Sequence, residues 1–161
     1  MSFDDDESPI ADRTGERCGA GQSGDVWFLA GTYGSRPVER KCTVPAGKHL
    51  FFPVITYVVW PNSCGRGCSG CKDLTATAKA QTDDAEDLHA ELDGKPLADL
   101  ASHRLVPESC FKLPVSDPPP WAASNGYWLA LKPLPKGTHT LRIGGTLPTL
   151  RQQIRYTLIV Q

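Results

Sequence analysis

Short apolar or alternating segments recur along the chain, and turns rich in glycine and proline separate them. Segments such as "VWFLAG" and "HLFFPVITYVVW" are rich in β-branched and aromatic residues, which favour strands. We therefore expect an all-β fold, mainly an antiparallel β-sandwich or jelly roll with one short helix. The spacing predicts about eight or nine short strands, within segments 26–31, 36–47, 49–60, 88–97, 103–106, 109–115, 127–145 and 151–160.

Two of these segments carry information beyond strand propensity. Val38, Arg40, Cys42 and Val44 fall on alternate positions, so all four should share one face of their strand. Pro53 lies inside the next apolar segment. Because proline cannot donate a hydrogen bond to a ladder, we expect an edge strand or a bulge there.

One segment, 73–85, has the pattern of a helix. Asp73 could cap its N-terminus, and Leu74, Ala78 and Ala85 give a thin apolar stripe.

The remaining segments are typical of turns and loops. Asp93 and Gly94 suit a hairpin turn. Residues 116–126 suggest a proline-rich surface loop, and residues 1–25 a loose arm that is acidic and then rich in glycine and serine. A single β-sandwich domain would then comprise residues 26–161.

Length and charge restrict the function. The 161 residues fit one domain, and the formal net charge is −1 without a basic run. This argues against nucleic acid or an anionic membrane as a partner. The longest apolar run, 50–60, is shorter than the ~18 residues that a membrane span needs. Acidic residues 4–7 follow Met1 closely, so no signal peptide is visible, and the chain is either cytosolic or a mature exported protein.

Three of the six cysteines lie in the stretch 62–73, "NSCGRGCSGCKD". An even number of cysteines in an exported domain indicates three disulfides. One alternative is a zinc site formed by Cys64, Cys68, Cys71 and Cys110. Another is a redox-active pair of Cys68 and Cys71, because a helix N-terminus close by would lower a thiol pKa.

His89, Glu91 and Asp93 occupy alternate positions and should share one strand face. Three titratable groups in a row could act as general acid and base or bind a cation. The alternative is a solvated strand face that ends in an ordinary turn. The chain has no nucleophile elbow, P-loop or dinucleotide fingerprint, so these three residues are the catalytic candidates.

Other groups could hold a metal ion. The acidic run 83–87 could bind calcium, although it lacks EF-hand spacing. His49, His89, His103 and His139 could converge on copper or zinc, but no H-x-H or H-E-x-x-H spacing supports this. A solvated loop and hydrogen-bonded histidines are simpler interpretations, and we expect no metal or cofactor.

Aromatic residues suggest a binding surface. Trp60 precedes the cysteine-rich stretch, Trp121 lies in the proline-rich segment, and Tyr127 and Trp128 should face opposite sides of a strand. Exposed rings can stack on sugars because each offers a flat apolar face. Trp60, Trp121 and Tyr127 are therefore the ligand-binding candidates, with Trp121 the best placed for surface recognition. The alternative is that Trp27, Trp60 and Trp128 are core anchors.

Four blocks extend this picture: "GERCGAGQSGDVWFLAGTYG", "RKCTVPAGKHLFFPVI", "LHAELDGKPL" and "GYWLALKPLPKGTHTLRIGG". Over residues 9–160 the chain resembles a family of small secreted bacterial proteins without an established activity. The resemblance implies an exported, β-rich, disulfide-bonded domain. Members typically carry an export signal and a Trp-rich helical segment ahead of the point where this chain starts, so we expect a trimmed N-terminus. Members often have Asn where this chain has Thr56.

The same resemblance implies a disulfide pairing. The family-like blocks suggest the pairs Cys18–Cys42 and Cys64–Cys110, which would leave Cys68 and Cys71 as a local pair. Disulfides of this kind place the protein in the periplasm or outside the cell.

Three functions follow as hypotheses. The first is a non-catalytic exported module that binds a glycan or another cell-surface partner. The second is a small secreted hydrolase, glycosidase-like, that uses carboxylates or histidine as acid and base. The third is an exported metal-binding protein.

Overall fold

The computed structural model of the chain describes residues 8–34, 36–64, 68, 70–113 and 117–161, which form two sheets and one α-helix. In spatial order the first sheet contains β1 (Val26–Phe28), β3 (His49–Val59), β8 (Trp121–Leu131) and β6 (Arg104–Leu105), and β7 (Phe111–Lys112) also pairs with β8. The second sheet contains β2 (Val38–Val44), β10 (Leu150–Val160), β9 (Gly137–Leu147), β4 (Glu86–Leu92) and β5 (Lys95–Pro96). The α-helix is α1 (Cys71–Asp83), and two short 3-10 turns are η2 (Pro61–Ser63) and η3 (Leu100–His103).

This architecture confirms the predicted fold class, a mainly β chain with one short helix. Most neighbouring strands are antiparallel, as expected. Two pairs are parallel, β1 with β3 and β2 with β10, so both sheets are mixed.

The main core lies between the two sheets. Phe52 and Val54 of the first sheet pack in one buried cluster with Ile143, Tyr156 and Leu158 of the second. In β2 the predicted alternation is present, because its four inward residues are buried and the three between them are exposed. The sheets therefore form a sandwich with a mainly apolar interior, in which Arg40 and Gln152 are buried polar residues.

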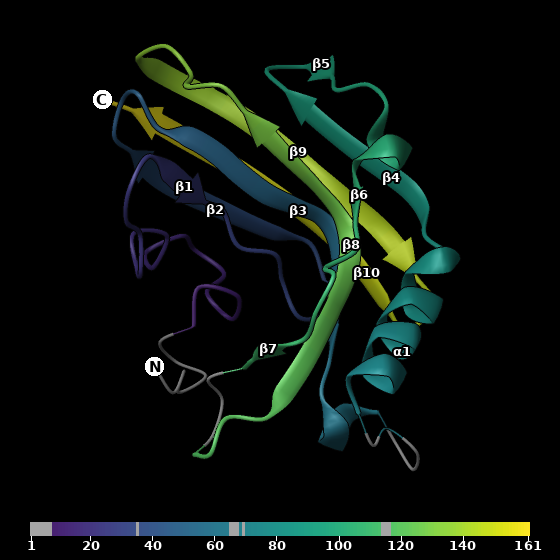
Figure 1. Ribbon diagram of the computed structural model, residues 1–161. Helices are drawn as coiled ribbons and strands as arrows, with labels where there is room; N and C mark the ends of the chain where they lie inside the picture. Colours follow the sequence, from purple (N-terminus) through teal and green to yellow (C-terminus); the bar gives the residue numbers. More distant parts are fainter. Residues whose placement is uncertain (1–7, 35, 65–67, 69, 114–116) are drawn as a thin grey trace.

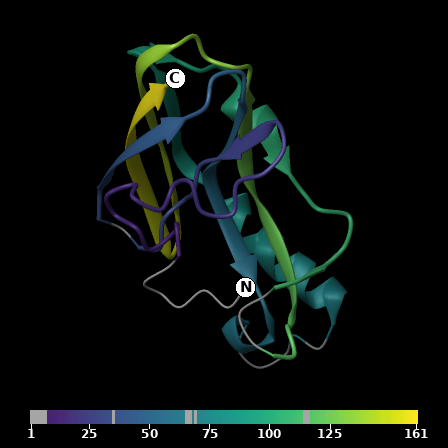
Figure 2. The same ribbon diagram turned by 90° about the vertical axis from the view of Figure 1, so that its left-hand side faces the viewer.

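The helix covers the part of the first sheet that extends beyond this sandwich. Leu74 and Ala78 of α1 pack against Val59 of β3 and Ala123 of β8 in a second cluster. Figures 1 and 2 show α1 on one side of β8 and the N-terminal segment on the other. One face of β3 and β8 is therefore buried under a sheet and a helix, and the other is left for the N-terminal segment.

Three local features differ from expectation. The helix begins at Cys71, so Asp73 lies in its first turn rather than at its cap. β8 begins at Trp121, inside the segment expected to be a loop, because β7 supplies it with a hydrogen-bonding partner there. Pro53 lies at a register shift of β3 on β8, which is the predicted bulge, and β3 is an interior strand.

Residues 8–25 contain no helix or long strand, and they are attached to the domain. The Cys18–Cys42 disulfide links them to β2, and Ser8 and Gly15 are buried. Within the described part of the chain, no helix has both the length and the apolar character that crossing a bilayer requires.

Candidate functional site

A groove lies on the face of the first sheet that points away from α1. Side chains alternate along β8, so Ser124 and Trp128 face the groove, whereas Ala123 and Asn125 face the helix. The groove has a volume of about 780 Å³, within the usual range of small-ligand sites. Residues of β1, β3, β7 and β8 line it together with parts of the N-terminal segment and the loop after β1.

Aromatic rings gather at two places along the groove. At one, Trp128 stacks on Phe51 with ring centroids 5.1 Å apart, and Phe28 packs edge-on against Phe51 at 5.8 Å. At the other, Phe111 of β7 and Trp60, which follows β3, both line the groove. The exposed fractions are 51% for Phe28 and 36% for Phe111, large values for apolar rings.

The polar groups of the groove are uncharged. Among the described residues that line it there is no Asp, Glu, Lys, Arg or His. Several lining residues carry hydroxyl groups, and those of Thr32, Ser124 and Thr149 have no hydrogen-bond partner within the described chain. They are therefore available to a ligand.

A buried arginine holds two walls of the groove together. Arg40 of β2 is 4% exposed, and its guanidinium donates to the carbonyls of Ile10 at 3.0 Å, Ala30 at 2.8 Å and Gly31 at 3.0 Å. All three acceptor residues line the groove. Arg40 also donates to the Tyr156 hydroxyl at 2.7 Å. One side chain from the second sheet thus fixes the N-terminal segment and the loop after β1.

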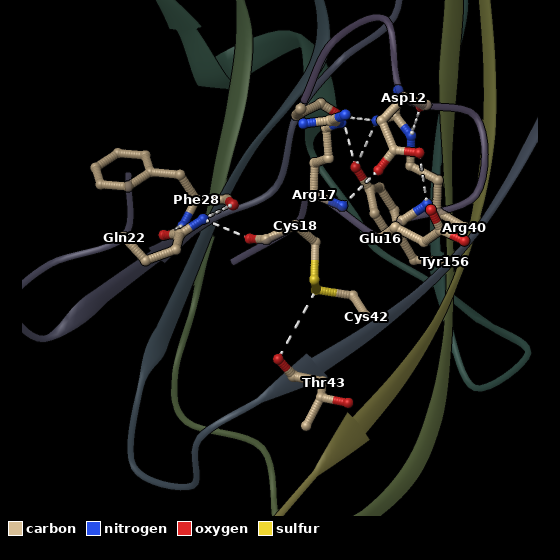
Figure 3. The surroundings of a disulfide bond; sticks show 12 residues. Asp12, Glu16, Arg17, Cys18, Gln22, Phe28, Arg40, Cys42, Thr43 and Tyr156 are labelled. Carbon is tan, nitrogen blue, oxygen red and sulfur yellow. Dashed lines mark hydrogen bonds between the residues drawn. A yellow bond between two sulfur atoms is a disulfide. The ribbon is translucent and has the colours of Figure 1, made fainter. Parts of the chain in front are cut away.

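The phenol of Tyr156 and the backbone carbonyl of Asp12 both accept hydrogen bonds from this arginine (Figure 3). Burial raises the pKa of Tyr156, against the opposing effect of the Arg40 charge. Burial also acts to raise the pKa of Asp12, but backbone amides of Arg17, Thr14 and Gly15 donate to its carboxylate and the net pKa is lowered. Asp12 therefore folds the arm into a compact turn next to the Arg40 contacts.

Gln22 fixes the backbone of Phe28, which is another lining residue of the groove (Figure 3). Its amide donates to the Phe28 carbonyl at 2.8 Å and accepts from the Phe28 amide at 2.9 Å, which occupies the free edge of β1. It also donates to the carbonyl of Cys18 at 2.9 Å. The Cys18–Cys42 disulfide, Gln22 and Phe28 thus form a continuous connection from β2 to the groove.

Gln152 of β10 stabilises the bulge below the groove. Its amide nitrogen donates to the carbonyls of Pro53 at 3.2 Å and Val54 at 2.7 Å, where the ladder to β8 is interrupted. Its oxygen accepts from the Thr32 amide at 3.1 Å. Both amide groups, Gln22 and Gln152, are therefore used for positioning and not for a ligand.

The three predicted ligand-binding residues have different surroundings. Trp60 lines the groove, as a binding role requires. Trp121 is 53% exposed, but it pairs with Lys112 on the face opposite to Phe111, and the Lys112 ammonium lies 4.1 Å from its ring centre. Tyr127 is buried in the core, and the adjacent Trp128 faces the groove.

The three predicted catalytic residues do not converge on a common point. The exposed His89 ring contacts the Asp87 carbonyl at 2.9 Å, and Glu91 lies 3.8 Å from Arg142. Asp93 lies in the expected turn, 2.7 Å from the ring of His139. None of the three lines the groove.

Asp93 and His139 each shift the pKa of the other. The hydrogen bond from His139 lowers the pKa of Asp93, and a bond from the Thr140 amide adds to this. The hydrogen bond to Asp93, with a second to the Pro135 carbonyl, raises the pKa of His139. His139 is thus the half-buried, hydrogen-bonded side chain that the sequence suggested.

The cysteines form the pairs Cys18–Cys42, Cys64–Cys68 and Cys71–Cys110. The first confirms the expected pair, whereas Cys64–Cys110 and a local Cys68–Cys71 pair were wrong. The helix begins at Cys71, which places this sulfur next to Cys110 beside β7. All four cysteines of the alternative zinc site are disulfide-bonded, and the described residues contain no group of three metal-binding side chains.

Several residues of the groove were missed by the sequence analysis, although some left a signal. Arg40 and Gln152 each occupy an inward position in a strand whose other inward residues are mostly apolar. Such a polar residue must find internal partners, because burying it unpaired is costly. Phe28 and Phe111 left no comparable signal, since both lie in strands of only two or three residues.

Neither a family model nor a curated protein matches the sequence, and no solved structure matches the fold. What the groove binds is therefore inferred from its lining residues.

Proposed function

We propose that the protein is a non-catalytic exported binding module and that its groove binds a neutral carbohydrate. A single observation carries this proposal. The groove combines exposed aromatic rings with unpaired hydroxyl groups, and no charged side chain occurs among its described lining residues.

The chemistry of sugars fits this combination. A pyranose ring presents C–H groups on its faces and hydroxyl groups around its rim. Aromatic rings such as Trp60 and Trp128 can stack on the faces, while hydroxyls such as that of Ser124 can bond with the rim. A charged ligand would have to leave water without an opposite charge in the groove to compensate.

A hydrolase is the weaker alternative. Glycoside hydrolysis needs two carboxylates on either side of the scissile bond. The described groove lining contains none, and Glu91 and Asp93 lie on the second sheet, paired with Arg142 and His139. Export is supported by the three disulfides, which are compatible with an oxidising compartment.

Affinity electrophoresis in gels that contain β-glucan, mannan or xylan tests the proposal. We expect at least one of these neutral polysaccharides to retard the protein. The substitution Trp60→Ala should weaken that retardation about tenfold, because one stacking ring is lost. Trp121→Ala is the matched control, since this exposed tryptophan lies on the other face of β8. Equal loss in both variants, or no retardation by any of the three, would contradict the proposal.

A further inference from the structure

We infer that the groove binds the interior of a long sugar chain, through two aromatic subsites that contact different rings of the same chain. This inference rests on the proposed function and specifies its ligand. The substrate class is a linear, neutral chain of pyranoses with equatorial substituents, of the β-1,4-glucan type.

The register of the sheet places the two subsites. Pro53 of β3 pairs with Trp128, and Val59 pairs with Ala123. Trp60 is the next residue of the chain, and Ala122 pairs with Phe111 on the other side of β8. One subsite is therefore Phe28 with Trp128, and the other is Trp60 with Phe111.

The distance between the subsites sets the length of the ligand. From Pro53 to Trp60 the chain advances seven positions, shortened by the bulge, which corresponds to about 20 Å at the rise of a strand. A single sugar or a disaccharide is too short to contact both ends. A chain of several rings can contact both subsites. Its contact with the second subsite is then intramolecular, which raises the affinity without any additional kind of interaction.

The floor between the subsites is formed by small side chains, two of which carry hydroxyl groups. Thr56, Val58 and Ser124 lie between the two aromatic pairs on β3 and β8 and line the groove. The Thr56 hydroxyl donates to the Asn125 carbonyl at 3.0 Å. The hydroxyl of Ser124 has no partner within the described chain. A chain that lies along the floor would meet hydroxyl groups in the middle and flat rings at the ends.

The flat aromatic rings of the subsites favour sugars whose substituents are equatorial. In a pyranose whose hydroxyls and linkages are equatorial, both faces carry only axial hydrogens and can pack on an aromatic ring. An axial hydroxyl would leave only the opposite face of the sugar free to pack on a ring such as Trp128. The absence of charged groups from the described lining restricts the chain to neutral residues.

Isothermal titration with glucose, cellobiose and cellohexaose tests the inference. We expect cellohexaose to bind at least tenfold more tightly than cellobiose, because only the longer chain reaches both subsites. The substitution Phe111→Ala should remove most of this difference. It should lower the affinity for cellohexaose about tenfold and that for cellobiose less than twofold, since the Trp128 subsite remains.

Phe111 is suited to this test because it is exposed and lies in a two-residue strand. Trp60→Ala should have the same effect, because Trp60 belongs to the same subsite, and Trp121→Ala should have none. Thermal unfolding checks that each variant is folded.

Equal affinity for cellobiose and cellohexaose would overturn the two-subsite inference and leave glycan binding intact. Binding of the gel polysaccharides without binding of cellohexaose would overturn the inference that the ligand is a chain of pyranoses with equatorial substituents. No binding to any sugar would overturn the proposed function itself.

Discussion

His139 is held by two acceptors, so its charged form is favoured in the folded protein. Its ring contacts the Asp93 carboxylate at 2.7 Å and the Pro135 carbonyl at 2.9 Å. Because folding raises its pKa, the stabilisation is complete below the ordinary value of about 6.5 and is lost as the pH rises through the raised value. The lowered pKa of Asp93 matters at acidic pH. The contribution of Asp93 to the stability of the fold is lost only as the pH falls through its lowered pKa.

His139→Gln should therefore destabilise the protein more at about pH 5 than at about pH 9. Urea unfolding of both proteins at the two pH values measures this difference. His103→Gln is the control, because the ring of His103 is exposed and has no hydrogen-bond partner in the described structure. A pH-independent loss in His139→Gln would mean that its ring acts only through packing.

Arg40 is the most connected buried side chain of the groove region, with five hydrogen bonds to four carbonyls and one hydroxyl. Arg40→Met should cost about 3 kcal/mol or more, because several buried acceptors lose a charged donor at once. Arg155→Met, at an exposed arginine of β10, should cost within about 0.5 kcal/mol. Chemical denaturation gives both values, and similar costs would show that the Arg40 contacts are not stabilising.

At the scale of residues, the sequence predicted well which residues share a strand face, and it predicted poorly which contacts each side chain makes. It placed Arg40 on the same face of β2 as Val38, Cys42 and Val44, and it placed Tyr127 and Trp128 on opposite faces of one strand. It could not choose between these two rings, because the choice depends on which face of β8 meets the second sheet. That contact joins segments distant in sequence and has no local pattern.

At the scale of elements, the positions of the strands were more predictable than their lengths. β3, β9 and β10 each have 11 residues and show a clear pattern, whereas β8, of the same length, begins six residues before the predicted segment 127–145. The short strands β1, β6 and β7 lie inside predicted segments but are shorter than those segments. β7 has two residues and exists because β8 pairs with it and the Cys71–Cys110 disulfide fixes the residue before it. The cysteine pairing was likewise partly wrong, because it depends on where α1 begins relative to β7.

The disulfides connect elements over very different lengths of chain, which predicts a rank order of stability. Cys71–Cys110 spans 39 residues, Cys18–Cys42 spans 24 and Cys64–Cys68 spans 4. The loss of loop-closure entropy in the unfolded chain predicts contributions of about 4, 3.5 and 2 kcal/mol respectively. Paired Cys→Ala variants, compared by urea unfolding, should follow this order. A larger cost for the shortest loop would point to contacts in the folded state instead.

At the scale of the whole molecule, the two faces of the first sheet have different tasks. One face of β3 and β8 is buried against the second sheet and α1. The other carries the groove, and polar side chains such as Arg40, Gln152 and Gln22 connect the walls of the groove to the second sheet and the arm. The sandwich thus acts as a rigid support, and the binding surface is attached to it by hydrogen bonds and a disulfide.

This separation predicts that binding and stability respond differently to solution conditions. The described groove lining contains no Asp, Glu, His, Lys or Arg, so the affinity for a neutral polysaccharide should stay within about twofold between about 0.01 M and about 1 M salt. It should also stay constant from about pH 5 to about pH 9, the range in which His139 changes the free energy of unfolding. Titration calorimetry with the retarding polysaccharide measures the affinity, and urea unfolding under the same conditions measures the stability. An affinity that falls steeply with salt would show that charged groups outside the described lining contact the ligand.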